Sequence, residues 1–236
     1  MGTKIKSIGR NIIQWKEHCV MLSIGARDEV LNTDGISDEE IAKKIKDFLK
    51  RTKMARQWWL PVVPAREARL RVAAVPSCDE KEAHKMIRWQ LQGRWGDEKD
   101  FVTDYVLAPC SNTGTKALIG VIDQAVLARY WNILRAAGVL WDGWSVGCLI
   151  VQNSVEDYLR NEGFLENGNY GLLYFDDGRC DLCIFTDRWP VLSRSFVIDD
   201  QDAIAGVDSF LSQQINISLQ ACREEHKIEI LRIVLL

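Results

Sequence analysis

Hydrophobic positions near the start of the chain follow first the period of a strand and then that of a helix. β-Branched and apolar residues cluster between turn residues from Lys4 to Trp15 and from Cys19 to Gly25, which predicts a β-hairpin. Ser37 and Glu40 form a capping box, which predicts that a helix begins there. The apolar face of this helix follows at helical spacing and consists of Ile41, Ile45, Phe48 and Leu49.

Two further strands are predicted from Trp58 to Val63 and from Arg69 to Val75. Proline has no backbone N–H to donate to a sheet. Pro61 and Pro64 therefore predict either an edge strand or a break between the two strands.

The stretch from Arg69 to Gly138 has the order strand, helix, strand, strand, helix. This order predicts a compact α+β module with helices on one face of a small sheet. Gly138 stands at the expected C-cap position of the second helix. The apolar faces comprise Ala83, Met86, Ile87 and Leu91 in the first helix, and Val126, Leu127, Tyr130, Ile133, Leu134 and Ala137 in the second.

Further along the chain the pattern changes to a meander. Strands are predicted from Tyr170 to Phe175, from Asp181 to Thr186 and from Val191 to Val197, with Asp177-Gly178 as a tight turn. A long amphipathic helix follows and returns the chain to a last strand. Its apolar positions are Ile204, Val207, Leu211, Ile215 and Leu219.

The composition limits the classes of function. With 236 residues, 47% of them hydrophobic and 27% charged, the chain can form an ordered core in one or two domains. The net charge is −3 and no stripe of lysine and arginine is present, so nucleic acid is not expected as a partner. The basic residues from Lys43 to Arg56 lie largely on the predicted helix, where they are typical of a solvated face.

The seven cysteines are odd in number and scattered, which is typical of a reducing compartment. No stretch approaches the roughly 18 apolar residues of a membrane-spanning helix, and no signal peptide is recognisable. A cytoplasmic location is therefore expected. The chain ends in the apolar strand pattern ILRIVLL, and we hypothesise that it is the soluble part of a longer, single-pass membrane protein.

Two short motifs resemble catalytic or metal sites. Residues 143–147, GWSVG, match the G-x-S-x-G nucleophile elbow with Ser145 as the nucleophile, and His226 follows in a permissible order. The apolar strand before this motif is short and His226 stands at a polar helix end, so a structural crossover is the favoured interpretation. Cys180 and Cys183 have the spacing of a metal or redox pair, but a zinc site needs four ligands. Residues three apart on a strand face opposite sides, so buried structural cysteines are predicted and no metal site is expected.

Five local patterns are distinctive in combination. They are Met86 to Gln92 after Ala74 to Pro76, Asp104 to Leu107, Tyr130 to Gly138, Leu172 to Ile184, and Ser193 to Phe196. Together with the order of elements they resemble the cytoplasmic actin-like proteins of type IV pilus and type II secretion systems, the PilM and GspL families. The resemblance extends over most of the chain.

The resemblance implies an α/β (α+β) fold, a degenerate actin-like, ribonuclease-H-like structure with two lobes. Residues 1–68 and 139–165 are expected to form the first lobe, residues 69–138 an inserted small α+β subdomain, and residues 166–236 the second lobe. It also implies a place at the inner face of the cytoplasmic membrane. The implied partners are the amino-terminal domain of a secretion or pilus assembly ATPase, a membrane-anchored platform protein, and a second copy of the chain.

The phosphate loops of the nucleotide-binding relatives are altered here. After Gly9, Asn11 stands in place of an acidic residue and Ile13 in place of a glycine, and a β-branched side chain obstructs the approach of backbone to phosphate. Asp176 and Gly178 of the second loop persist, but three carboxylates crowd the place of the phosphate. No cofactor is therefore expected.

The nine tryptophans are an unusual feature of the composition. Most are expected in the core, but Trp58, Trp59 and Trp95 lie near polar or turn residues, and exposed tryptophans anchor protein interfaces. They are the predicted partner contacts of a non-catalytic scaffold. Two alternatives stay open: an ATP-binding PilM-type pilus assembly protein and, from another class, a serine hydrolase that uses Ser145.

Overall fold

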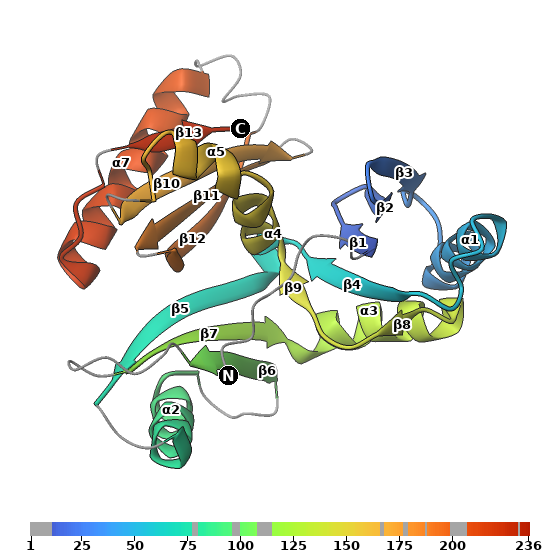
Figure 1. The fold of residues 1–236 in the computed structure, drawn as a ribbon, viewed down its shortest axis with the longest axis horizontal. Coiled ribbons are helices and arrows are strands. Elements are labelled where there is room, and N and C mark those ends of the chain that lie inside the picture. Colours follow the sequence, from blue (N-terminus) through green and yellow to red (C-terminus); the bar gives the residue numbers. More distant parts are fainter. Residues whose placement is uncertain are drawn as a thin grey trace.

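A computed structural model of the chain describes residues 11–76, 80–95, 100–107, 115–165, 168–176, 179–186, 188–198, 207–230 and 232–236. The strands in these ranges form three sheets, and each sheet has helices packed on it (Figure 1).

The first sheet has the strand order β3-β2-β1-β4-β8, and β9 also pairs with β4. Its strands are β1 (Asn11–Trp15), β2 (Cys19–Ile24), β3 (Arg27–Asn32), β4 (Trp58–Val63), β8 (Leu140–Trp141) and β9 (Ser145–Val146). The predicted hairpin is confirmed over β1 and β2, whereas residues 4–10 lie outside the described part of the chain. β3, which has three charged residues among its six, was not predicted.

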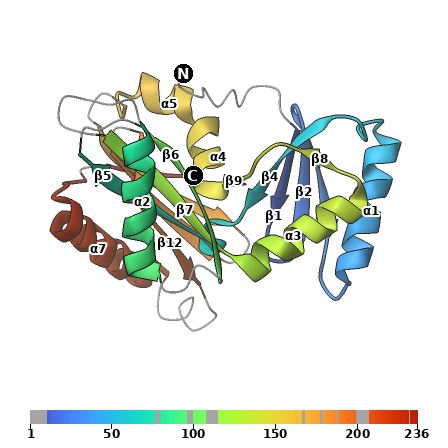
Figure 2. The same cartoon turned by 90° about the horizontal axis from the view of Figure 1, so that it is seen from below.

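Helices α1 (Asp38–Arg51) and α3 (Gln124–Ala137) cover one face of this sheet (Figure 2). The capping box is confirmed, because the Ser37 hydroxyl accepts the Glu40 N–H at 3.3 Å and the Glu40 carboxylate accepts the Ser37 N–H at 3.1 Å. α3 ends at Gly138, whose φ of 73° is accessible to glycine without a steric penalty. The core between helices and sheet includes Ile13, Trp15, Val20, Leu22, Ile45, Phe48, Trp59, Ile133 and Leu134.

Of the two predicted alternatives the break between the strands is confirmed, because Pro64 and a short 3₁₀ helix separate β4 from the next strand, whereas Pro61 lies in a central strand and not at an edge. β8 pairs with the first two residues of β4 and β9 pairs with the last two. The ladder on this side is therefore interrupted at Leu60 and Pro61, and a residue without an N–H is tolerated where a ladder is broken. Pro64 ends the strand before the short 3₁₀ helix η1 (Ala65–Glu67).

The third sheet is antiparallel with the order β5-β7-β6. Its strands are β5 (Ala68–Val75), β6 (Phe101–Leu107) and β7 (Thr115–Asp123). Helix α2 (Glu80–Trp95) lies on one face of this sheet and buries Ile87 against Val75, Ala117 and Ile119. α3 follows β7 directly and leads the chain back to α1 (Figure 2).

The second sheet has the order β12-β11-β10-β13. Its strands are β10 (Asn169–Asp176), β11 (Arg179–Thr186), β12 (Trp189–Val197) and β13 (Ile233–Leu235). Helices α4 (Gly147–Ser154) and α5 (Glu156–Asn161) pack on one face, and α7 (Val207–His226) packs on the other. Cys180 lies in the core on the α7 side and Cys183 in the core on the α4 side, so the prediction of two buried cysteines on opposite faces is confirmed.

The division of the chain at residues 68, 138 and 165 stays a prediction. Two observations bear on it. α3, which the division places in the inserted subdomain, packs its buried side chains into the core of the first sheet. α4 and α5, which it places in the first lobe, contribute Cys148 and Leu159 to a core shared with the second sheet.

Candidate functional site

The turn between β1 and β2 meets the start of β11 at an ion pair. Glu17 lies in that turn, and Arg179 is the first residue of β11. The Arg179 guanidinium donates from both Nε and Nη2 to the Glu17 carboxylate, with 3.1 Å between Nη2 and Oε1. The pair joins residues 162 positions apart and links the first sheet directly to the second.

Each charge in this pair stabilises the other. The hydrogen bond from Arg179 lowers the pKa of Glu17 below its ordinary value, against the opposite effect of burial, and the charges of Arg179, Arg66 and His18 act in the same direction as the hydrogen bond. The same bond raises the pKa of Arg179. Both groups are therefore ionised at neutral pH.

A second group of polar side chains lies beside this pair. Arg66 Nη2 and Glu67 Oε1 of η1 are 3.9 Å apart, and the Tyr130 hydroxyl of α3 donates to Glu67 Oε2 at 2.5 Å. Burial, followed by the bond to Glu67, raises the pKa of Tyr130 well above its usual range, so the phenol stays protonated. We call Glu17, Arg66, Glu67, Tyr130 and Arg179 the junction cluster.

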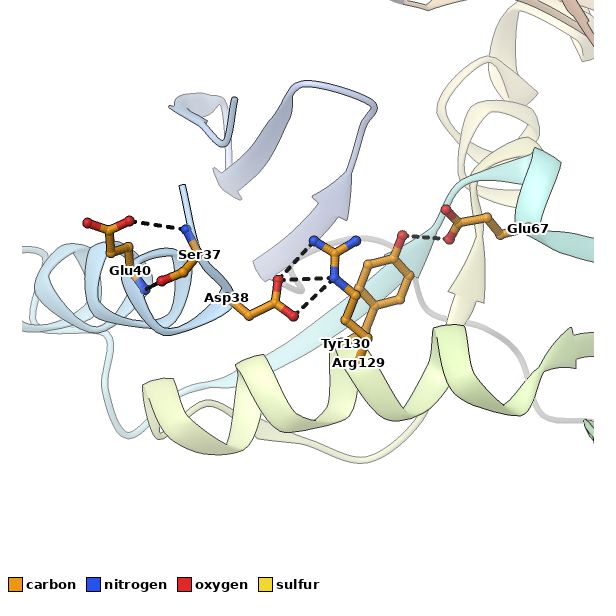
Figure 3. A network of polar contacts seen from close by, with 6 residues as sticks. All are labelled: Ser37, Asp38, Glu40, Glu67, Arg129 and Tyr130. Carbon is orange, nitrogen blue, oxygen red and sulfur yellow. Dashed lines mark hydrogen bonds and ion pairs between the residues drawn. The ribbon is translucent and has the colours of Figure 1, made fainter. Parts of the chain in front are cut away.

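The position of Tyr130 is fixed through α1. Its neighbour Arg129 donates from Nε and Nη2 to the Asp38 carboxylate at 2.9 to 3.1 Å (Figure 3). Asp38 is the first residue of α1 and directly follows the N-cap Ser37. The capping box, the bidentate pair and the Tyr130–Glu67 hydrogen bond thus connect α1, α3 and η1 in series.

The junction cluster is neutralised from within. Guanidinium groups bind phosphates and carboxylates through pairs of parallel hydrogen bonds. In this structure the Arg179 guanidinium is already bound in this way by Glu17, and Arg66 lies beside Glu67. The junction cluster therefore acts as a structural link between the two sheets. The guanidinium groups of Arg179 and Arg66 are paired with the carboxylates of Glu17 and Glu67.

The predicted phosphate-loop residues are placed differently. Asn11 begins β1, and its Nδ2 donates to the Trp58 carbonyl at 3.2 Å. Asp176 is the last residue of β10, although its side chain, like Gly9 and Gly178, lies outside the described residues. Residues 11–13 form a strand, as the hairpin pattern predicted, and the turn comes only after Trp15, so the phosphate loop that the comparison with nucleotide-binding relatives placed there is wrong.

Ile13 is 0% exposed and lies in the core beneath α1 and α3. Its expected role as an obstruction to phosphate is wrong, because successive residues of a strand face opposite sides and Ile13 shares the helix-covered side with Trp15. It is a structural residue of the first sheet.

The three tryptophans predicted to contact partners do not share one environment. Trp58 is 57% exposed, whereas Trp59 is 1% exposed and packs on Phe48 at 6.1 Å between ring centroids. The prediction for Trp59 is wrong, because neighbours in β4 point to opposite faces and Trp59 faces the core. The side chain of Trp95 lies outside the described residues.

Ser145 lies within β9, in the ladder opposite Val62, and α4 begins two residues later. The side chain of His226 lies outside the described residues. His18 bonds to Asp34 at 2.7 Å, and His84 lies against Tyr105 with 5.0 Å between ring centroids. The described contacts of these two histidines are therefore with Asp34 and Tyr105, and neither contact involves Ser145.

The described residues contain no group of three or more histidine, cysteine, aspartate or glutamate side chains that could hold a metal ion. Among the helices described, none is both long and apolar enough to cross a membrane.

The junction cluster was not found from the sequence. Its residues are spread from position 17 to position 179, and none belongs to a motif with characteristic spacing. The one local signal is that Arg179 closes the predicted hairpin turn at 177–178, but its partner Glu17 is too distant in sequence to be paired by any pattern.

No protein-family model matches the chain, and no curated protein matches it in sequence. Solved structures do match its fold. A chain of the PilM–PilN type IV pilus biogenesis complex has 17% identity and a TM-score of 0.76, over 97% of this chain and 81% of that one. The cytoplasmic domain of EpsL, an inner membrane component of the type II secretion system of Vibrio cholerae, has 10% identity and a TM-score of 0.50, over 79% of this chain and 70% of that one.

A third structure, a Bacteroides thetaiotaomicron protein of unknown function with an actin-like ATPase fold, covers all of this chain and 94% of its own length at 13% identity, with a TM-score of 0.45. Identities this low establish a fold and leave function open. The matches to the PilM–PilN complex and to cytoplasmic EpsL show that the chain shares their fold, the actin-like fold that the sequence resemblance predicted.

Proposed function

We propose that the protein is a non-catalytic cytoplasmic scaffold of a type IV pilus or type II secretion assembly platform. It would act by binding other polypeptides at the inner face of the cytoplasmic membrane. Its partners would be the amino-terminal domain of the assembly ATPase and a membrane-anchored platform protein, with a second copy of the chain as a further candidate.

The observation that carries this proposal is the match of 97% of the chain to a structure from the PilM–PilN complex at a TM-score of 0.76. The match to the EpsL cytoplasmic domain agrees with it, because both structures come from assembly systems. The two systems use related architectures, so the proposal covers both.

The non-catalytic part of the proposal is supported by the junction cluster. Arg179 and Glu17 bind each other where a turn of the first sheet meets the second sheet. A nucleotide placed between these elements would have to break a bidentate ion pair before its phosphates could use the guanidinium. Holding the sheets in a fixed relation suits a protein that presents surfaces to partners.

The direct test is complex formation with the cognate assembly ATPase. The purified chain and the amino-terminal domain of the ATPase should elute together from a sizing column, and the ATPase without that domain serves as the control. Separate elution at high concentration of both proteins, with the platform protein also failing to bind, would contradict the proposal.

Trp58 gives this test a residue-level control. Trp58→Ala should weaken the complex if this exposed tryptophan contacts a partner, with little change in folding because 57% of the side chain is already in water. Trp59→Ala is the matched variant, and its first effect should be on folding, because Trp59 is buried.

Nucleotide titration separates the scaffold from the ATP-binding alternative. Calorimetry with ATP and magnesium should give no binding heat for the wild-type chain. Saturable binding would favour a PilM-type ATP-binding protein. A fluorophosphonate probe that labels the wild-type chain and not Ser145→Ala would instead favour the serine hydrolase.

A further inference from the structure

Strand β6 is an edge strand of the third sheet (Figure 1). All seven of its residues pair with β7 in one continuous antiparallel register, from Phe101 opposite Asp123 to Leu107 opposite Ala117. Within the ranges that the structure describes, no strand pairs with the other edge of β6. Such an edge offers a row of N–H and C=O groups to a further strand.

The other edge strands are shorter or are covered by neighbouring elements. β3 is tied to α1, because Lys44 Nζ donates to the Asn32 carbonyl at 3.0 Å and Arg51 pairs with Glu29. β8 has two residues and β13 has three, which is too short for a specific ladder. β12 lies against β5. Among the described residues, β6 is therefore the long edge strand whose outer edge is not covered.

The outward face of β6 carries a distinctive pattern. Phe101, Tyr105 and Leu107 face α2 and belong to the core beneath it. Val102, Asp104 and Val106 alternate with them on the other face, where the valines are 38% and 55% exposed and Asp104 is exposed. On β5 and β7 the same face is covered, since Leu70 and Leu118 pack into the core of the second sheet.

Asp104 also indicates which backbone groups face the open edge. The Tyr105 N–H donates to Asp104 Oδ1 at 2.8 Å, which identifies Tyr105 as a residue whose N–H points away from β7. Alternation gives Thr103 and Leu107 the same direction. One donor of the free edge is thus capped by a carboxylate from its own strand.

We propose that β6 binds an extended polypeptide segment that adds a strand to this edge and carries a lysine or arginine between two apolar residues on one face. The apolar residues would pair with Val102 and Val106, and the basic residue with Asp104. Once Asp104 pairs with the incoming cation, the Tyr105 N–H becomes available to the new ladder. This inference rests on the proposed function in one respect, that the protein acts by binding polypeptides.

The position of Asp104 argues against a second copy as the occupant. Asp104 is the central residue of β6, so antiparallel pairing of two β6 strands in a centred register would place two Asp104 carboxylates directly opposite each other. Like charges in this relation destabilise a strand pair, and opposite charges stabilise it. The charge pattern therefore favours a different chain with a basic residue.

The probe is a fluorescein-labelled peptide of sequence TVTKTVT, and its partner peptide has Asp in place of the central Lys. Fluorescence anisotropy should show the Lys peptide binding the wild-type chain about fivefold more tightly than the Asp peptide, the effect of one cross-strand charge pair. Asp104→Lys should reverse this preference. Asp28→Lys makes the same change of charge on β3, an edge strand of the first sheet, and should leave the preference for the Lys peptide as in the wild type.

A second variant tests the backbone ladder. Thr103→Pro removes an N–H that faces the open edge and leaves the pairing with β7 in place, so it should abolish peptide binding with an unchanged circular dichroism spectrum. Absence of saturable binding to the wild-type chain would overturn the inference, as would equal binding of the two peptides or persistent binding to Thr103→Pro. If the ATPase complex forms while the peptides fail, the β6 inference alone is lost and the proposed function stands.

Discussion

Glu17 and Arg179 form a bidentate ion pair that fastens the first hairpin to the first residue of β11. The pair is partly exposed, so its contribution to global stability is expected to be small, about 0 to 1 kcal/mol. Its importance lies in its position, because it joins the β1–β2 turn to β11, at a place apart from the hydrophobic contact that Val146 makes with the cores of both sheets.

The first prediction concerns the relation between the two sheets. Glu17→Arg and Arg179→Glu each place like charges at the junction, so each should loosen the contact and increase the radius of gyration measured by small-angle X-ray scattering. The double variant restores an opposite-charge pair and should return the radius toward the wild-type value. Arg51→Glu breaks the pair between α1 and Glu29 of β3, which does not involve the second sheet, and should leave the radius unchanged. Identical radii for all variants would show that the pair does not hold the sheets together.

The second prediction is a dependence on pH. The pKa of Glu17 is lower in the folded protein than its ordinary value of 4.5, so the folded state binds this proton less tightly than the unfolded chain does. The ion pair therefore stabilises the folded state when the pH is above the ordinary pKa of Glu17. This stabilisation is lost as the pH falls through the lowered pKa of the folded protein. Glu17→Gln should have a lower melting temperature than the wild type at neutral pH, and the difference should shrink below pH of about 4. A difference that grows on acidification would contradict this assignment.

The third prediction concerns Tyr130 and Glu67. Tyr130→Phe removes the donor to a charged acceptor in a buried setting and should lower the free energy of unfolding by about 1.5 to 3 kcal/mol in urea titrations. Tyr158→Phe is the matched control, because Tyr158 is 50% exposed, and its effect should stay within about 0.5 kcal/mol. Equal effects of the two substitutions would show that the hydrogen bond does not stabilise the junction cluster.

The fourth prediction follows from the corrected position of Ile13. Ile13→Ala should lower the free energy of unfolding by about 2 to 5 kcal/mol, because it leaves a cavity beneath α1 and α3. Ile12→Ala is the matched variant on the opposite, half-covered face of β1 and should cost less. If Ile13 instead obstructed a phosphate, Ile13→Ala would fold normally and gain affinity for ATP in calorimetry, which we do not expect.

Local signals in the sequence were sufficient for most individual elements. The capping box at Ser37 and Glu40 and the C-cap at Gly138 depend on residues within a few positions of one another, and both are present as predicted. The opposite-facing burial of Cys180 and Cys183 follows from the period of a strand in the same way. Distributed patterns also indicated the actin-like fold, although no single motif did.

Contacts between strands and turns that are far apart in the sequence could not be predicted from local signals. Pro61 and Pro64 predicted either an edge strand or a break, because proline cannot donate a ladder bond, but whether a neighbouring strand is interrupted opposite Pro61 depends on residues 140–146. Ile13 was assigned to a phosphate loop by comparison with the nucleotide-binding relatives, although the strand pattern in the sequence already extended to Trp15, where β1 ends.

The amino-acid sequence by itself determined the start of α1, the end of α3, most of the buried face of each of these helices, and the class of fold, because these depend on backbone capping and on hydrophobic period. The tertiary structure alone decided that Glu17 meets Arg179, that Tyr130 meets Glu67, and that no strand of the described ranges pairs with the outer edge of β6. Each of these relations depends on how separate sheets are placed in space, and the free energy that places them is summed over whole cores, so no local pattern records it.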